Sequence, residues 1–513
     1  MPSLFRRAFQ RGWVPIALLC VYVYAFPYFA GLRHANELPR ILTTTQIVDH
    51  GTLRLDDCVD RLGSRADVST TPEGHVYQNK APGLAFLAVP IYGPLSFGFG
   101  LAGRSPPAAL TTWLFRVLVV TVPTVLFFAT FRRVSHRFAE SEEARNGSLV
   151  AVALGSMLLP YGMMFMSHAL AASLVGFAFA LAIRCTRDPG PISEPRGALG
   201  VGALLGLAML TEYQAVFGAI VVAGYFLWAA RTRRRVAVSL LAGTVPFMVV
   251  LALYHRAAFG SPFRTGYAYS VDTDNRVGFM GIVGLSGTSV RQLLVSTDNG
   301  LLLLSPWVLL AVVGGVAIAR NAAWRARVGR EALASALVVV AYTVFVASLA
   351  PSFGRAGWSV GPRYLAVAVP FFAWLAAAGL EVCLGTSALR IPGIALVLVG
   401  VGVHVLAATT YPHWPSMFAN PLFEISVRLL REGHAPPSFG TWIGLRGLAS
   451  LAPLYAGVVV LVIRLLDPAR RYVLEVGLGV LLATFIVVRY ERLAVTKDPD
   501  VATWNFVLGT LEP

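Results

Sequence analysis

Charged side chains are scarce in this sequence. Only 13% of its 513 residues are charged, whereas 56% are hydrophobic and the mean hydropathy is +0.67. An ordinary soluble domain does not have this composition, because water must solvate its surface. Apolar stretches of roughly 20 residues, enough to cross about 30 Å of hydrocarbon, recur from Trp13 to Val488. The composition therefore predicts an all-α integral membrane protein with many crossings.

Cysteine and lysine are also rare. The four cysteines lie far apart, and only Cys58 falls in a predicted outer loop, so neither a disulfide framework nor a CxxC metal site is predicted. Only two of the 42 basic residues are lysines, Lys80 and Lys497. The net charge of +16 comes from arginines in short clusters between apolar segments, which argues against a nucleic-acid partner.

The distribution of arginine determines the predicted topology. Arg6, Arg7 and Arg11 precede the first apolar segment, which we interpret as a retained anchor with a cytoplasmic N-terminus. Treating the apolar, proline-containing residues 83–102 as a re-entrant or interfacial helix makes every later arginine cluster cytoplasmic. The sequence then predicts about thirteen spanning helices, at approximately 13–32, 108–131, 148–165, 167–184, 197–211, 213–230, 236–257, 299–319, 332–350, 362–380, 391–410, 447–466 and 471–488.

A single integral membrane domain, residues 1–513, is predicted, because the sequence shows no convincing internal repeat. In this topology the long loops 33–107, 258–298 and 411–446 share the outer face, and a short outer tail follows at 489–513. Binding and catalytic groups concentrate in long loops. We therefore expect an extracytoplasmic site on a multi-pass protein of the cell membrane, with catalytic residues on juxtamembrane helices of the first loop.

The first loop contains the main candidates for chemistry. Glu37 follows the first span by about one helical turn, where its carboxylate suits a general base; the alternative is a solvated acid paired with Arg40. Lys80 precedes the apolar helix, and a compact cation at head-group depth suits a phosphate; the alternative is ordinary snorkelling. Tyr77 and Asn79 add neutral hydrogen-bonding groups beside Lys80.

A second polar group lies at the outer end of a later span and contains Trp358, Arg363 and Tyr364. A guanidinium at a helix entrance can direct two donors onto phosphate oxygens, so Arg363 is a phosphate-binding candidate. The two aromatic side chains either stack on a sugar or form an interfacial belt.

Four further residues are weaker candidates. His168 has no HxxxH or HExxH companion, which favours a structural histidine over a metal ligand. Glu212 is a carboxylate at membrane depth. Because a charged side chain is energetically unfavourable there, its presence suggests a functional role. Arg264 lies in a loop suited to an acceptor cleft. Arg116 lies inside the second span, where an unpaired charge would cost at least roughly 2.5 kcal/mol, so we expect it to have a partner.

The order of these residues resembles the GT-C superfamily of membrane glycosyltransferases, which use sugars carried on polyprenyl phosphate. Within it, the sequence is similar to protein O-mannosyltransferases and to the transferases that add aminoarabinose to lipid A. Asn36, Glu37 and Arg40 resemble the acidic pair and the arginine of the first loop in these relatives. The segment Tyr77–Pro82 resembles their Tyr-Phe-x-Lys-Pro-Pro type of segment, and Asp49 lies in a stretch that resembles their first-loop helix end.

The resemblance also covers residues 260–263, 299–307 and 358–365, which look like a bacterial branch of these transferases. It implies a GT-C-like bundle of helices with juxtamembrane helices in the first outer loop. The sequence departs from the aminoarabinose enzymes after the last predicted span, where about 25 residues remain. It also has Asn36 where the relatives have an aspartate, which leaves Glu37 as the candidate base.

The resemblance implies an inverting displacement at the anomeric carbon. Glu37 would take the proton of the acceptor, while Lys80 and Arg363 would stabilise the polyprenyl-phosphate leaving group. The implied partners are a polyprenyl-phosphate-linked sugar and a lipid, glycan or protein acceptor of the cell envelope. No cofactor is required and no metal ligand set is predicted, although a divalent metal is compatible with the reaction.

Two other functions remain as alternatives. A transporter or flippase of a lipid-linked sugar would typically show paired broken helices and charges near the midplane, whereas the polar groups here lie at one face. A polysaccharide polymerase or ligase also acts on polyprenyl-linked glycans, but its main loop lies late in the chain, whereas the longest loop here is the first.

Overall fold

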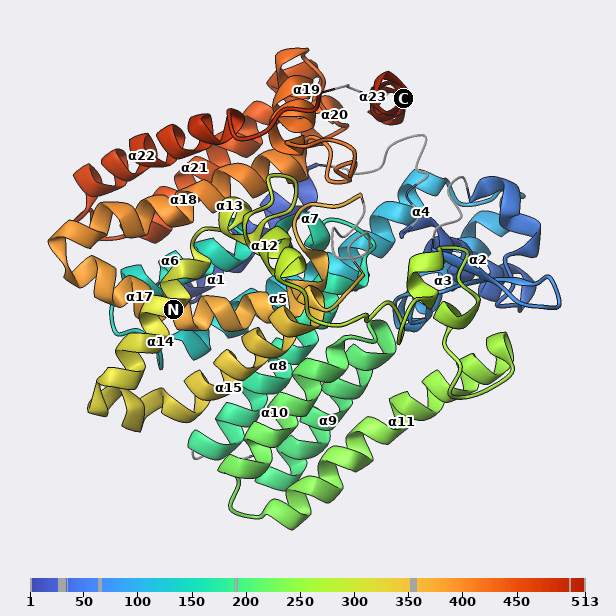
Figure 1. Ribbon diagram of the computed structural model, residues 1–513, viewed down its shortest axis with the longest axis horizontal. Coiled ribbons are helices and arrows are strands. Elements are labelled where there is room, and N and C mark those ends of the chain that lie inside the picture. Colours follow the sequence, from blue (N-terminus) through green and yellow to red (C-terminus); the bar gives the residue numbers. More distant parts are fainter. Residues whose placement is uncertain are drawn as a thin grey trace.

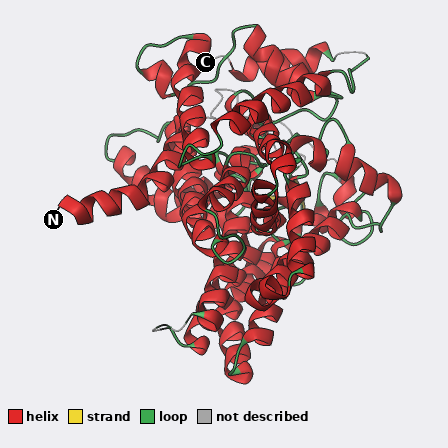
Figure 2. Cartoon of the chain, turned by 90° about the vertical axis from the view of Figure 1, so that its left-hand side faces the viewer, coloured by secondary structure: helices red, strands yellow, loops and turns green. Residues whose placement is uncertain are grey.

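The structure is a computed structural model that describes residues 2–25, 34, 36–62, 67–188, 190, 192–350, 358–497 and 500–511. Most of these residues lie in helices, as Figures 1 and 2 show. One short antiparallel hairpin is the only sheet in these ranges. The predicted all-α class is therefore confirmed.

The first half of the chain contains the first loop and four long helices, α8 to α11, that lie side by side (Figure 1). Its elements are α1 (Pro2–Tyr24), α2 (Leu38–His50), η1 (Asp56–Arg61), β1 (Val68–Thr70), β2 (Val76–Gln78), α3 (Gly83–Gly100), α4 (Ala108–Phe115), η2 (Arg116–Thr121), α5 (Val122–Ser135), α6 (Glu142–Ala153), α7 (Leu158–Gly162), α8 (Ser167–Arg187), α9 (Glu194–Thr211), α10 (Ala215–Ala229) and α11 (Arg233–Phe259).

The second half contributes the remaining helices of the bundle and a group of short helices near the C-terminus (Figure 1). Its elements are η3 (Gly266–Tyr269), η4 (Thr273–Arg276), α12 (Gly287–Val295), α13 (Leu301–Leu304), α14 (Val308–Arg320), α15 (Ala322–Ala347), η5 (Arg363–Ala368), α17 (Val369–Gly385), α18 (Ser387–Thr409), η6 (Leu422–Val427), α19 (Arg428–Arg431), α20 (Phe439–Trp442), η7 (Gly447–Leu451), α21 (Ala452–Leu466), α22 (Val473–Glu491) and α23 (Val501–Leu511).

Nine helices in the described ranges are long and apolar enough to cross a membrane, and four shorter apolar helices accompany them. The multi-pass character of the protein is therefore confirmed. The nine include α3, which has the length and composition of a span although the sequence analysis treats it as re-entrant. The count of thirteen spans and the orientation of the chain stay predictions.

Two predicted spans are not continuous helices. Residues 148–165 are interrupted after α6, and residues 299–319 are interrupted between α13 and α14. The two interruptions meet, because the indole nitrogen of Trp307 donates to the carbonyl of Gly155 at 2.6 Å and the Ser305 hydroxyl donates to the same oxygen at 3.4 Å. These distant donors satisfy a carbonyl at the break. Each of these predicted spans therefore contains a break, and whether the two ranges cross the membrane stays a prediction.

The segment predicted as an outer tail contains helix α23. Trp504 and Val507 of this helix are buried in an apolar cluster with Tyr411 and Trp414, which follow α18. The ring of Trp358 packs edge-on against Phe506 at a centroid distance of 5.4 Å. The last helix therefore covers part of the loop before η5.

A buried carboxylate connects three helices of the bundle. Glu331 of α15 is fully buried and accepts hydrogen bonds from Arg187 of α8, at 2.7 Å from Nε and 3.1 Å from Nη2. The hydroxyl of Tyr225 in α10 donates to the same carboxylate at 2.7 Å. Removing the carboxylate leaves the partly buried Arg187 guanidinium without its counter-ion.

We therefore expect Glu331→Ala to lower the free energy of unfolding by roughly 3 kcal/mol, the lower end for a broken buried pair because the Arg187 side chain is 27% exposed. Thermal or denaturant unfolding in detergent measures the change. Glu140→Ala is the control, since Glu140 also pairs with an arginine but is 71% exposed, and it should cost less than about 1 kcal/mol. Equal losses would contradict the role given to Glu331.

Candidate functional site

A cluster of charged side chains gathers where the first loop meets the starts of α8 and η5 and the end of α9. It contains three cations, Arg40, Lys80 and Arg363, and two acids, Asp67 and Glu212. Arg40, Asp67, Lys80 and Glu212 are buried, whereas Arg363 is half-buried. Asp67 and Lys80 flank one short hairpin, and tertiary packing brings the other three residues to them.

The centre of the cluster is the ion pair between Asp67 and Lys80, whose Oδ1 and Nζ atoms lie 3.0 Å apart. The β hairpin creates this pair: Val68 of β1 is opposite Gln78 of β2, and the amide of Asn79 donates to the Asp67 carbonyl at 3.2 Å. The hairpin therefore holds Asp67 beside the residue that follows Asn79. Neither the hairpin nor Asp67 was identified from the sequence.

The charges of the cluster determine the protonation of its acids. Burial alone would raise the pKa of Asp67, but Lys80, Arg363 and Arg40 together lower the pKa of this carboxyl to about 2. For Glu212 the balance is the opposite: burial raises its pKa despite the hydrogen bond from Ser167 and the nearby cations. Asp67 is therefore ionised at neutral pH.

Lys80 is held from a second side by Tyr267 of η3. Its ammonium donates to the Tyr267 hydroxyl at 3.5 Å and lies 4.8 Å from the centre of the ring. Burial acts to lower the pKa of Lys80, but Asp67 and the tyrosines outweigh it, so the net pKa is raised and the ammonium stays charged. The start of η3 packs closely against Asn79 only because residue 266 is glycine, since a Cβ at Gly266 would lie 2.7 Å from the Cα of Asn79.

Arg40 connects the first loop to α8 and Glu212. Its guanidinium donates to the backbone and side-chain oxygens of Asn36, and Nη2 lies 3.4 Å from the Ser167 hydroxyl. Ser167 in turn donates to Glu212, and His168 Nδ1 lies 3.3 Å from the same carboxylate oxygen. Gly83 allows α3 to begin against this region, since a Cβ there would lie 2.7 Å from the carbonyl oxygen of Leu210.

The guanidinium of Arg363 packs on the ring of Tyr364, 5.2 Å from its centre, and Nη2 donates to the hydroxyl at 3.4 Å. Tyr364 also contacts the ring of His168. The Nε atoms of Arg363 and Arg40 are buried and have no hydrogen-bond partner among the described residues. A buried donor without an acceptor is costly, so both arginines are suited to an anion.

Glu37 belongs to a separate ion pair next to this cluster. It is fully buried, and its two oxygens accept from Nε and Nη2 of Arg116, both at 2.8 Å, while the amide of Phe165 donates at 2.7 Å. Arg116 begins the π-helical segment η2 within the second predicted span. The sequence analysis expects a partner for this charge, and that partner is Glu37. Nε2 of His413 lies 3.5 Å from Glu37 Oε2. The role of Glu37 as a base stays a prediction.

His34, Glu37 and His413 form a trio whose potential ligand atoms lie within 4.8 Å of one another, and sequence analysis did not identify it. The histidine rings stack at 3.8 Å. However, Arg116 already binds both Glu37 oxygens, and both His34 nitrogens have partners, the Trp358 carbonyl and the amide of Asn36. A metal there would have to displace these contacts, so the fit to a metal is poor.

Five residues selected from the sequence do not join the charged cluster. Asp49 accepts hydrogen bonds from Tyr92 and Ser96 and so connects α2 to α3. The other four contact residues outside the cluster: Tyr77 contacts Phe259, Asn79 contacts Ser270, Arg264 contacts Tyr269, and Trp358 contacts Phe506 and His34. Arg40, Lys80, His168, Glu212, Arg363 and Tyr364 are brought together.

No protein-family model matches the sequence, and no curated protein matches it. Across most of its length the structure is similar to two GT-C membrane glycosyltransferases. ArnT from Cupriavidus metallidurans in the apo state gives a TM-score of 0.49 at 16% identity over 95% of this chain and 78% of that chain. Bound to undecaprenyl phosphate, ArnT gives 0.45 at 14% identity over 94% of this chain and 78% of that chain.

The archaeal oligosaccharyltransferase AglB from Archaeoglobus fulgidus, in complex with an inhibitory peptide and a dolichol-phosphate, gives a TM-score of 0.43 at 13% identity, over 98% of this chain and 60% of that chain. These similarities assign no sequence family, because the identities are only 13–16% and each TM-score is below 0.5. The functional argument therefore depends on the side chains of this chain.

The Glu37–Arg116 pair leads to a prediction for stability. Glu37→Gln removes the counter-ion of a guanidinium that is only 2% exposed, so we expect the free energy of unfolding to fall by roughly 3–5 kcal/mol. Adding Arg116→Met should restore part of this loss, because it removes the unpaired charge. Unfolding in detergent measures both variants. A Glu37→Gln protein as stable as the wild type would show that the pair does not support the fold.

The lowered pKa of Asp67 predicts how stability depends on pH. Because the pKa in the folded protein is about 2 and the ordinary value is about 3.9, the ion pair stabilises the protein above about pH 4 and is lost as the pH falls through 2. The difference in Tm between wild type and Asp67→Asn should therefore shrink from about pH 5 to about pH 2.5. A constant difference would contradict the ionised pair.

Proposed function

We propose that the protein is a membrane glycosyltransferase that moves a monosaccharide from a polyprenyl-phosphate carrier to an acceptor of the cell envelope. The observation that supports this most is the excess of buried positive charge in the cluster. Three cations, Arg40, Lys80 and Arg363, face two acids, Asp67 and Glu212, so positive charge is in excess whether or not Glu212 carries a proton. An anion would balance this excess and would accept from the two arginine Nε donors that have no partner among the described residues.

The position of the cluster favours a lipid-linked phosphate. Lys80 lies just before α3, and Arg363 opens the apolar segment that continues into α17, so both cations stand at the ends of membrane-length helices. The phosphate of a polyprenyl carrier lies at this depth while its chain stays in the bilayer. We place the site on the extracytoplasmic side, because the arginine-rich connections lie at the opposite ends of α8 and α10.

The proposed reaction is an inverting displacement at the anomeric carbon. The acceptor loses a proton as its new glycosidic bond forms, and the bond between the sugar and the phosphate oxygen breaks. The phosphodiester donor carries one negative charge, and the leaving polyprenyl phosphate gains a second. Lys80, Arg40 and Arg363 therefore attract the transition state more strongly than the substrate, which is the requirement for electrostatic catalysis.

Two carboxylates are candidates for the base, and the geometry favours Asp67 over Glu37. Three hydrogen bonds hold Glu37, two of them from Arg116. Asp67 shares Lys80 with the proposed phosphate site. When Lys80 turns toward a phosphate, Asp67 loses its closest cation and its affinity for a proton increases. Glu37 then keeps Arg116 and the start of α2 in position.

The direct test is sugar transfer by the purified protein, with a panel of polyprenyl-phosphate monosaccharides and a membrane extract as acceptor source. We expect Lys80→Met and Arg363→Gln each to lower the rate by about 10²–10³-fold, the usual cost of removing one group that stabilises developing charge. Arg291→Gln, at an exposed position of a predicted outer loop, is the matched control and should transfer at the wild-type rate. If the donor binds but no sugar is transferred under any acceptor condition, the proposed transferase activity is contradicted and a transporter is favoured.

The choice of base is tested with isosteric variants in the same assay. Asp67→Asn should bind the donor and lose transfer, whereas Glu37→Gln should lose transfer only in proportion to its loss of folded protein. Transfer that survives in Asp67→Asn and disappears in folded Glu37→Gln would reverse the two roles. Adding a chelator to the same assay tests the expectation that transfer requires no metal.

A further inference from the structure

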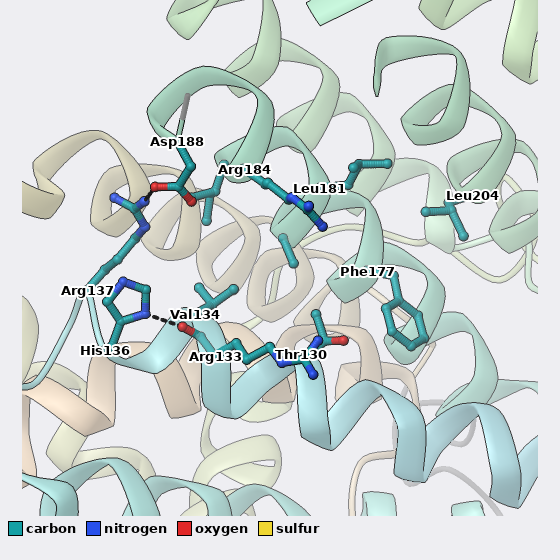
Figure 3. Close-up of a pocket in the computed structure, with 12 residues that line it drawn as sticks. Thr130, Arg133, Val134, His136, Arg137, Phe177, Leu181, Arg184, Asp188 and Leu204 are labelled. Atoms are coloured by element: carbon teal, nitrogen blue, oxygen red, sulfur yellow. Dashed lines mark hydrogen bonds and ion pairs between the residues drawn. The ribbon is translucent and has the colours of Figure 1, made fainter. Parts of the chain in front are cut away.

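A hollow of about 620 Å³ lies at the other end of the bundle, between the C-terminal end of α5, the last turns of α8 and part of α9. Figure 3 shows Arg133 and Arg184 extending into it from α5 and α8, while Phe177 and Leu204 lie toward its other end. The start of α8 lies at the charged cluster described above, whereas its last turns line this hollow, so the hollow is a different site, one helix length away.

The charges on its wall are not balanced. Arg137 pairs with Asp188, and His136 contacts the backbone carbonyl of Arg133. Arg133 and Arg184 are exposed and have no acidic partner among the described residues. Two guanidinium groups therefore face the same space without a counter-ion.

Most of the remaining wall is apolar, with Thr130 as the polar exception. Phe177, Ala180, Leu181 and Leu204 line it along α8 and α9, which places hydrocarbon side chains further from the helix ends than the two arginines. A ligand that fills this space must present negative charge at one end and an apolar body at the other. Basic pockets between spanning helices bind anionic lipid head groups in this way.

A second hollow, of about 890 Å³, lies on the other side of α5 and shares Arg133 and His136 with the first. It has two additional arginines. Arg132 already pairs with Glu142 at 2.9 Å and donates to Asn146 at 3.1 Å, and Arg145 donates to the backbone carbonyls of Ala139 and Glu140. Arg133 and Arg184 are the arginines of these two hollows for which the described residues provide neither an acidic partner nor a hydrogen-bond acceptor, and only the first hollow contains both.

We propose that the hollow between α5, α8 and α9 binds one anionic phospholipid, with its phosphate on Arg133 and Arg184 and an acyl chain along Phe177, Leu181 and Leu204. A guanidinium suits a phosphate because its planar donors match the phosphate oxygens. The apolar wall selects a lipid over free phosphate. The inference does not depend on the proposed glycosyl transfer.

The test compares fluorescent phosphatidylglycerol with fluorescent phosphatidylcholine, each titrated onto the purified full-length protein in neutral detergent. Wild type should prefer the anionic lipid. Arg133→Gln/Arg184→Gln should bind it roughly tenfold more weakly, since each arginine near a membrane surface contributes up to about 1 kcal/mol. Binding of phosphatidylcholine should not change.

Arg234→Gln/Arg235→Gln is the control, because it removes two exposed arginines that open α11 at the same end of the bundle. It should bind phosphatidylglycerol as the wild type does. An equal loss in both double variants would overturn the site in favour of general surface charge. Displacement of the lipid by the same concentration of inorganic phosphate would also overturn it, because the apolar wall would then contribute nothing.

Discussion

The buried ion pair between Glu37 and Arg116 is the contact on which the arrangement of the first loop depends. A guanidinium inside the second span is tolerated only when a counter-ion reaches it, and Glu37, at the start of α2, supplies that charge with both oxygens. The amide of Phe165 completes the coordination of the carboxylate. The residue before Glu37 is Asn36, so fixing α2 in this way also positions the amide that donates to Asp67 and accepts from Arg40.

Part of the charged cluster could be predicted from the sequence. Lysine and carboxylates are rare in so apolar a chain, so each one at membrane depth is a candidate functional residue. Rarity identifies Lys80 and Glu212, whereas Arg363 and His168 are identified by their positions at the starts of predicted spans. Asp67 was missed because it lies in a polar loop where an acid is unremarkable, and only the pairing of β1 with β2 brings it to Lys80. The partner of Arg116 was equally invisible, since spacing along the chain carries no information about a contact 79 residues away.

The helical ranges were predictable from hydropathy, whereas the breaks within them were not. The interruption at Gly155 is stabilised by the indole of Trp307, and neither residue alone signals a break. Hydropathy measures whether a segment is stable in lipid, but the continuity of a helix depends on whether its backbone groups find other partners. The same limit applies to α23, because a short apolar helix after the last predicted span becomes visible only through its packing against Tyr411 and Trp414.

The pair between Asp67 and Lys80 explains how a strongly basic site remains stable without a ligand. If all three cations lacked a counter-ion, their mutual repulsion and burial would destabilise the fold. Asp67 neutralises one of them, and under the proposed function a donor phosphate would compete with Asp67 for Lys80. Arg40 and Arg363 retain buried donors without partners among the described residues, so they supply the initial attraction. In the proposed reaction, the exchange of Lys80 from Asp67 to the donor phosphate would free the Asp67 carboxylate beside the sugar, so one side chain would connect donor binding to the base.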